Sequence, residues 1–161
     1  MPHDLEKLAA RLQVLEDREA IRELIARYGP LADRGDASAL AALWEEEGMY
    51  EIVGFSTARG RAEIAALIEA PYHCALMADG CAHVLGPVAV TVERDSATAT
   101  GHSVVFRHHE GTFSAFRVSA NRWTLRRDAK DGHWRVRHRR NALLDGAEAA
   151  RVLLSVRGGA A

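Results

Sequence analysis

Residues 97–126, ATATGHSVVFRHHEGTFSAFRVSANRWTLR, decide the fold class of this protein. Valine, threonine and phenylalanine recur through the stretch with partial two-residue alternation, which is typical of strands that bury one face. Between the two runs, His109-Glu-Gly111 supplies turn chemistry, so we expect strands over 97–108 and 112–126. Similar runs at 81–93 and 133–143 extend the pattern to four antiparallel strands.

Helical patterns precede these strands. Apolar residues from Leu5 to Tyr28 recur mostly at helical spacing and predict a long helix, which Pro30 should kink or end because proline has no N–H. The other expected elements are a second helix over 36–48, a short strand over 49–53, a third helix over 60–69, and a short helix after residue 145 that runs through Val156 and frays at 158–159. Helices followed by long strands predict an α+β fold, in which a cone-shaped antiparallel sheet wraps around three N-terminal helices and encloses a pocket.

Composition narrows the class of protein. With 161 residues and 48% hydrophobic residues, one domain over 1–161 is expected, with 145–161 as a C-terminal tail. A formal charge of -1 disfavours nucleic acid and anionic membranes and favours a small, neutral partner. The first residues contain no basic stretch or apolar segment, so a cytoplasmic protein is expected. The two cysteines, Cys74 and Cys81, are expected to be buried thiols.

Two polar residues stand next to apolar neighbours where a pocket is expected. Asp33 follows Leu31-Ala32 at the end of the first helix, and His83 lies near the start of a strand. A carboxylate that binds one imidazole nitrogen makes the other nitrogen more basic, which suits acid/base catalysis. The alternative remains open that Asp33 is a turn residue and that the ring of His83 reaches water.

Other candidates lie on the later strands. By two-residue periodicity, His102 and His108 share a face with Val104 and Phe106, which would form a pocket wall or a strand with exposed ends. Ser119 and Asn121 alternate on the next strand beside Trp123, where buried polar groups need partners. Arg140 ends the last strand and would hold a carboxylate or oxyanion at the pocket mouth, or would be solvated.

A metal site from His73, Cys74, Cys81 and His83 is a further alternative. The adjacent ligands His73-Cys74 do not match the usual spacing of structural zinc ligands. We therefore expect no metal.

The segment from Leu15 to Tyr28, followed by Asp33 and the run to Trp44, resembles the opening of SnoaL-like domains of the nuclear transport factor two superfamily. Asp33 with His83 resembles the Asp/His dyad of scytalone dehydratase, bile acid 7α-dehydratase and hexachlorocyclohexane dehydrochlorinase. Tyr28 and Asp33, five residues apart, resemble the tyrosine and aspartate of the bile acid enzyme.

Later motifs extend the resemblance. Cys81-Ala-His83 resembles a Cys-x-His of the dehydrochlorinase, and Arg140 resembles its pocket arginine. His108 and Ser119-Ala-Asn121 resemble a second histidine and a pocket segment of scytalone dehydratase.

The sequence also departs from scytalone dehydratase. Ala32 replaces the tyrosine before the aspartate, and the second tyrosine aligns near Ile52, with Tyr50 two residues away. On an ideal helix Tyr28 and Asp33 project about 140° apart, so they face one pocket only if the backbone bends near Pro30.

The resemblance implies a cofactor-independent dehydratase acting on a small, largely apolar cyclic or polyketide- or steroid-like hydroxy compound. His83, oriented by Asp33, would remove a proton next to an activating group, and His108 would protonate or hold the departing group. Tyr28 is the fourth implied catalytic residue and would polarise the substrate together with Asn121. The residues implied to bind substrate are Ser119, Asn121, Arg140, Tyr50, His102 and Phe106. An isomerase or cyclase with the same dyad and a non-catalytic binding or scaffold domain are alternatives. The resemblance also implies a dimer or trimer that covers the outer sheet face.

Overall fold

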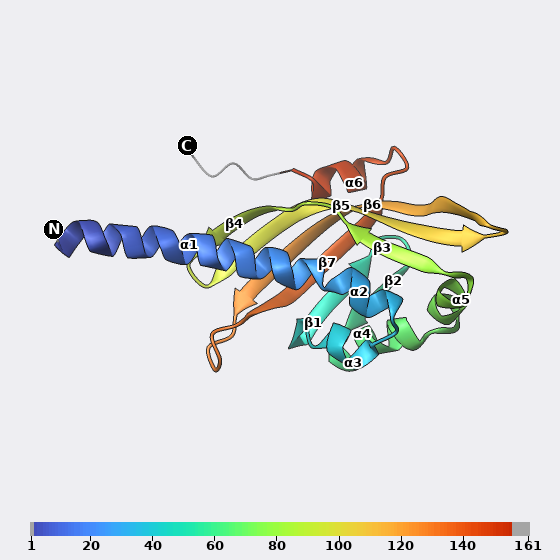
Figure 1. Ribbon diagram of the computed structural model, residues 1–161, viewed down its shortest axis with the longest axis horizontal. Coiled ribbons are helices and arrows are strands. Elements are labelled where there is room, and N and C mark those ends of the chain that lie inside the picture. The colour runs from blue at the N-terminus through green and yellow to red at the C-terminus, as the bar shows by residue number, and fades with distance from the viewer. Residues whose placement is uncertain (1, 156–161) are drawn as a thin grey trace.

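The computed structural model describes residues 2–155, which form an α+β architecture (Figure 1). The helices are α1 (Pro2–Ala26), α2 (Tyr28–Asp33), α3 (Ala37–Ala41), α4 (Gly60–Glu69), α5 (Pro71–Asp79) and α6 (Glu148–Leu153). The strands are β1 (Trp44–Ile52), β2 (Ser56–Arg59), β3 (Cys81–Leu85), β4 (Ala89–Glu93), β5 (Ser96–His109), β6 (Thr112–Arg127) and β7 (Trp134–Leu143).

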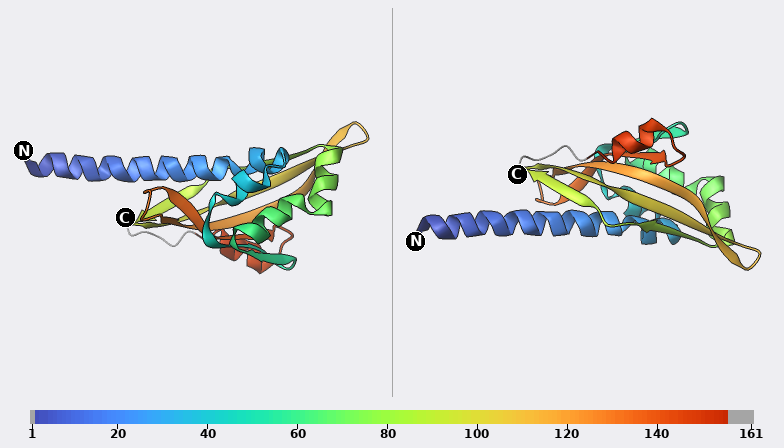
Figure 2. Two further views of the ribbon diagram at one scale, coloured as in Figure 1. Left: turned by 90° about the horizontal axis from the view of Figure 1, so that it is seen from below. Right: turned by 90° about the horizontal axis from the view of Figure 1, so that it is seen from above.

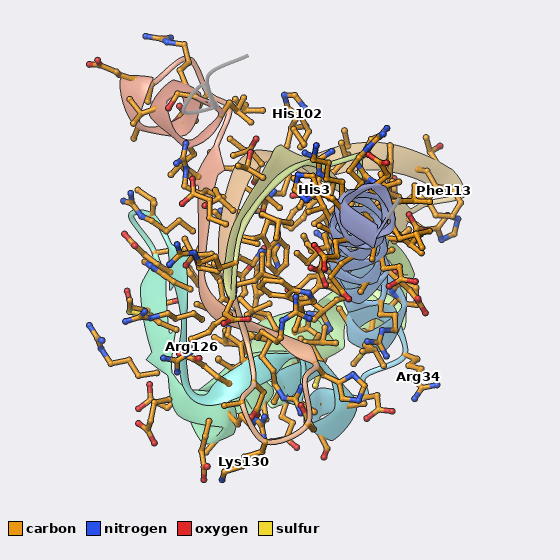
Figure 3. The ribbon with its side chains drawn as sticks, turned by 90° about the vertical axis from the view of Figure 1, so that its left-hand side faces the viewer. His3, Arg34, His102, Phe113, Arg126 and Lys130 are labelled. Atoms are coloured by element: carbon orange, nitrogen blue, oxygen red, sulfur yellow. The ribbon has the colours of Figure 1, made fainter. Side chains whose placement is uncertain are left out.

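All of these strands belong to one curved, unclosed sheet with the order β2-β1-β7-β6-β5-β3, and β4 pairs with β5 on the same edge as β3. The pairs are antiparallel except that β1 runs parallel to β7. Helices α1 to α5 lie on the inner side of the curve, whereas α6 lies on the outer side (Figure 2). The end-on view in Figure 3 shows the sheet bending around the interior. The expected fold class is therefore confirmed.

Several element boundaries differ from the sequence prediction. The second helix ends at Ala41, and Trp44–Ile52 form β1 because this segment pairs with β7. Gly48 lies inside β1 rather than at a helix end, and a Cβ there would come within 2.8 Å of the Trp44 side chain. The single strand expected over 81–93 is broken into β3 and β4 around Pro87, which has no N–H to donate to a ladder.

Helix α5 and strand β2 were not predicted. Pro71 follows the end of α4, as expected, but it also begins α5, where its missing N–H costs no hydrogen bond. The short helix expected in the tail is α6, while Val156 and residues 158–159 lie outside the described residues.

The main core lies between the helices and the inner face of the sheet. Its fully buried side chains include Ile21 of α1, Leu40 of α3, Trp44 of β1, Ile64 of α4 and Trp123 of β6. Tyr28 and Ala32 of α2 belong to the same core, and α2 packs against β3. At their closest approach, a Cβ on Gly29 would lie 2.1 Å from the main-chain oxygen of His83, so only glycine fits this contact. The sequence thereby brings the end of α2 to the strand that carries His83.

Candidate active site

Asp33, the last residue of α2, and His83, in the middle of β3, form a hydrogen-bonded pair. Nδ1 of His83 lies 2.6 Å from Oδ1 of Asp33. The main-chain N–H of His83 donates to the two carboxylate oxygens at 3.1 and 2.9 Å. Because a carboxylate only accepts, the proton of the neutral imidazole belongs on Nδ1, and Nε2 has a free lone pair. The pair can therefore present a general base.

The surroundings of the pair control its charge. Burial opposes ionisation of Asp33, but the hydrogen bonds and charge of His83 together outweigh burial and hold the pKa of the carboxyl below its ordinary 3.8. Cys81 donates its thiol to Oδ1 of Asp33 at 3.5 Å. Burial and then the neighbouring Asp33 raise the pKa of the Cys81 thiol to about 11. At neutral pH the site thus contains a carboxylate and a protonated thiol.

A cavity of about 250 Å³ lies beside His83, between α2, α4, α5 and the sheet. Its wall is mostly apolar, and the aromatic residues on it are Tyr28, Tyr50, Phe55, Tyr72 and Phe116. The polar residues on the wall, apart from the tyrosines, are His83, Ser103, Arg117, Arg139 and Asn141. An apolar pocket with a few polar groups is typical of small-molecule sites.

Arg139 of β7 is buried in the wall of this cavity. Its guanidinium lies 4.1 Å from the ring centroid of Tyr28, 4.6 Å from that of Tyr50 and 4.2 Å from that of Trp123. Its Nε and Nη2 donate to Oδ1 of Asn121 at 3.0 and 2.8 Å, whereas Nη1 has no hydrogen-bond partner among the described residues. A buried cation with an unused N–H can bind an anionic or carbonyl oxygen of a ligand.

Asn121 of β6 organises the polar groups behind the wall. Its Oδ1 also accepts from Asn141 at 3.0 Å, and its Nδ2 donates to Ser103 at 2.8 Å. The side chain of Asn141 accepts in turn from Arg117 at 2.9 Å. Since these residues come from β5, β6 and β7, the network ties three strands together beneath the cavity.

Among the residues expected at the pocket, Tyr28, Tyr50 and His83 line the cavity. Asp33 reaches His83 from α2 and is not part of the lining, so Tyr28 and Asp33 need not face the same way. Burial and then the neighbouring Tyr50 raise the pKa of Tyr28, so its hydroxyl keeps its proton and can donate.

The expected strand face on β5 is corrected by the structure. Ser103 and Val105 of β5 line the cavity, whereas His102 is exposed on the outside of the sheet (Figure 3). Phe106 is half-buried and is not part of the wall. His108 lies near the end of β5, where its Nδ1 is 3.3 Å from the main-chain oxygen of Asp79. Val104 also reaches the cavity, but the buried residues of this part of β5, Ser103 and Val105, stand at odd positions, whereas His102, Phe106 and His108 stand at even positions and lie outside it.

Three more corrections concern β6 and β7. Ser119 and Asn121 are buried, as expected, but they lie behind the cavity wall. Arg140 faces the outer side, where its Nε donates to Glu51 at 2.8 Å. The register of β6 and β7 shifts between Thr124 and Leu125, and this shift makes Arg139 point inward.

Sequence reasoning missed Ser103, Arg117, Arg139 and Asn141. The sequence offered one indication of Arg139, because this residue is adjacent to Arg140, the arginine that was predicted at the pocket. The alternation of Trp134 and Val136 favours even positions on the inner face, and only the irregularity in the pairing reverses this preference further along β7.

Asp33, Cys81 and His83 also form the one set of potential metal ligands found among residues 2–155, with ligand atoms within 4.8 Å of one another. The four-residue set considered from the sequence is not assembled. Cys74 is exposed, contrary to expectation, and His73 uses Nε2 to contact the main-chain oxygen of Ala32 at 2.9 Å. The high pKa of Cys81 favours a thiol over the thiolate that a metal ligand requires.

The fold and the cavity define a nuclear transport factor two-like domain. Residues 13–140 match the SnoaL-like domain family, and the chain belongs to that family. This family includes polyketide cyclases and dehydratases. No curated protein matches the sequence.

Solved structures support this classification. The chain is 66% identical to an NTF2-like protein with a cystatin-like fold from Novosphingobium aromaticivorans, with a TM-score of 0.91 over 94% of this chain and 97% of that one. Two more distant structures share the fold. Aln2 from a Streptomyces species is 18% identical, with a TM-score of 0.71 over 87% of this chain and 96% of that one. ActVI-ORFA from Streptomyces coelicolor is 22% identical, with a TM-score of 0.69 over 80% and 98%.

Across residues 2–155, no helix is both long and apolar enough to cross a membrane.

Proposed function

We propose that this protein is a cofactor-independent dehydratase that acts on a small, largely apolar cyclic or polyketide- or steroid-like hydroxy compound. The observation that carries the proposal is the 2.6 Å contact between Nδ1 of His83 and Asp33 at the wall of an apolar cavity. The contact leaves Nε2 as the ring nitrogen that can take a proton from a bound substrate.

The steps follow from the lining of the cavity. Nε2 of His83 removes a proton from a carbon next to a carbonyl group, and the electron pair of that C–H bond forms the new double bond. The C–O bond to the hydroxyl group breaks, and the imidazolium of His83 returns its proton to the departing oxygen, so that water leaves. His83 acts as both the general base and the general acid, because His108, the acid implied by the family resemblance, lies outside the cavity.

Negative charge develops on the carbonyl oxygen during proton removal. Arg139 and Tyr28 are placed to stabilise it, because the guanidinium has an unused N–H and the phenol keeps its proton. Both groups sit in a low-dielectric wall, where such interactions are stronger than in water. The apolar remainder of the wall favours ring systems over charged chains.

The proposal is tested by incubating the protein with a panel of cyclic β-hydroxyketones and following the conjugated ketone by absorbance and the loss of water by mass spectrometry. His83→Ala should lower turnover by about 10²–10⁴-fold, since it removes the acid/base group. His102→Ala is the matched control, because that ring lies on the outer face. Arg139→Met should lower turnover at least tenfold, while Arg140→Met, one residue further on, should have little effect.

Two outcomes would contradict the proposal. Turnover that survives in His83→Ala would remove the dyad from the mechanism. Binding of the ketones without any product would favour the non-catalytic binding domain. An isomerase or cyclase would use the same proton abstraction, and the mass of the product separates these reactions, because only dehydration loses water.

A further inference from the structure

The N-terminal half of α1 extends well beyond the edge of the sheet (Figure 1). Four leucines on this half, Leu5, Leu8, Leu12 and Leu15, are 54 to 69% exposed. The first residue of α1 that is buried is Asp17, and the apolar contacts of α1 with the core begin at Ile21. The protein therefore displays a leucine stripe that its own sheet does not cover.

The stripe faces away from the body of the protein. At about 100° per residue, the mean direction of the four leucines differs by about 180° from that of the buried α1 positions Asp17, Ile21, Leu24 and Ile25. Bending or sliding of α1 along the sheet would not cover the leucines. A partner can approach them without meeting the sheet.

The spacing of the stripe indicates which kind of partner fits. The leucines follow one another at intervals of three, four and three residues, which is the a/d repeat of a coiled-coil seam. The stripe covers only about 80° of the helix, which is narrower than the apolar face of a helix lying in a membrane surface. Charged residues of both signs flank it, namely Arg11 on one side and Glu16 on the other, whereas membrane-surface helices carry mainly basic residues.

We propose that the leucine stripe is an interface at which two copies of this protein pair through α1 as a short parallel coiled coil. In a parallel pair, Arg11 at position g faces Glu16 of the partner subunit at position e, and the same ion pair forms a second time by symmetry. In an antiparallel pair, two Arg11 side chains would instead face each other across the axis. Charge complementarity thus favours a second copy in the parallel orientation.

This interface is separate from the outer sheet face, which the family resemblance implies as an oligomer contact. Val84, Val118 and Leu143 on β3, β6 and β7 are exposed apolar residues away from the leucine stripe. If both surfaces are used, pairing through α1 doubles the size of whatever assembly the sheet face forms.

The first test measures the molar mass of the full chain by light scattering with size-exclusion chromatography, over a range of concentrations. Leu8→Glu with Leu12→Glu should halve the molar mass of the assembly, because four carboxylates would enter the seam of each pair. The control is Ala10→Glu, an exposed position on the opposite side of the same helix. A monomer of 17.6 kDa for the unmodified chain at every concentration, or an unchanged mass for the double variant, would overturn the proposal.

A second test does not depend on whether the glutamate variants keep α1 helical. In a Cys74→Ser background, Leu12→Cys should form an intermolecular disulfide under mild oxidation, because identical a positions in a parallel pair lie about 6 Å apart. Ala10→Cys, on the opposite side of the helix, should not form one. Equal crosslinking of the two variants, or none in either, would count against the parallel pair.

Discussion

Replacement of Asp33 by asparagine should destabilise the protein at neutral pH by about 2–3 kcal/mol. The carboxylate accepts hydrogen bonds from the main-chain N–H and Nδ1 of His83, at 2.9 and 2.6 Å, and from the thiol of Cys81. An asparagine that keeps its oxygen at the Oδ1 position places its NH2 group at the Oδ2 position, 2.9 Å from the main-chain N–H of His83, so that two donors face each other and the stronger main-chain hydrogen bond is lost. Hydrogen bonds to charged groups contribute about 1.5–3 kcal/mol each, and the 26% exposure of the Asp33 side chain places the loss below the sum of two.

The difference in unfolding free energy between the unmodified protein and Asp33→Asn should depend on pH. Since the pKa of Asp33 in the folded protein lies below its ordinary 3.8, its stabilising effect is complete above that value and is lost as the pH falls through the folded pKa. A protonated Asp33 resembles asparagine in charge. The two proteins should therefore approach equal stability in acid, even though both become less stable there.

Urea unfolding followed by tryptophan fluorescence measures the effect, because Trp44, Trp123 and Trp134 are buried. The exposed Glu47→Gln serves as a control for the loss of one negative charge. A difference in unfolding free energy below about 0.5 kcal/mol at pH 7, or one that does not shrink in acid, would refute the argument that the carboxylate is held by His83.

Two further predictions concern the packing and chemistry around the dyad. Gly29→Ala should lower the free energy of unfolding by about 1–3 kcal/mol or more, because the new Cβ would lie 2.1 Å from the main-chain oxygen of His83; an unchanged melting temperature would contradict this close contact. Cys74 is exposed and should react first with a disulfide reagent at pH 8, whereas Cys81, with a pKa of about 11, should react at least tenfold more slowly and accelerate as the pH rises towards that value. Equal rates for the two thiols would show that Cys81 is not held as its protonated form.

The type and order of most elements could be predicted from the sequence, because they depend on neighbours along the chain. Proline and glycine positions and the two spacings of apolar residues locate α1, α4 and the long strands β5 to β7. The helix predicted over 36–48 was wrong in its second half. The local spacing of Leu43 and Trp44 fits a helix, but pairing with β7, far away in the sequence, makes this segment a strand.

The Asp33 and His83 side chains were expected to meet, and the structure brings them together at 2.6 Å. Both residues stood out because a polar group beside apolar neighbours needs a partner. Arg139, the arginine in the cavity wall, could not be predicted in the same way. Arg139 and Arg140 are adjacent and chemically identical, and a shift in the pairing of β6 with β7 decides which of them points inward.

The α+β class, the order of its main elements and the chemical types available to a site could all be predicted from the amino-acid sequence, because local spacing and residue chemistry depend on near neighbours. Which strand faces line the cavity depends on the long-range pairing of the strands, since a single irregularity in a strand ladder reverses every side chain beyond it. The same long-range pairing gathers Ser103, Asn121 and Arg139 from three strands into one buried network. The leucine stripe on α1 is a similar case. The spacing of its four leucines can be read from the sequence, but their exposure depends on where the sheet ends in the folded protein.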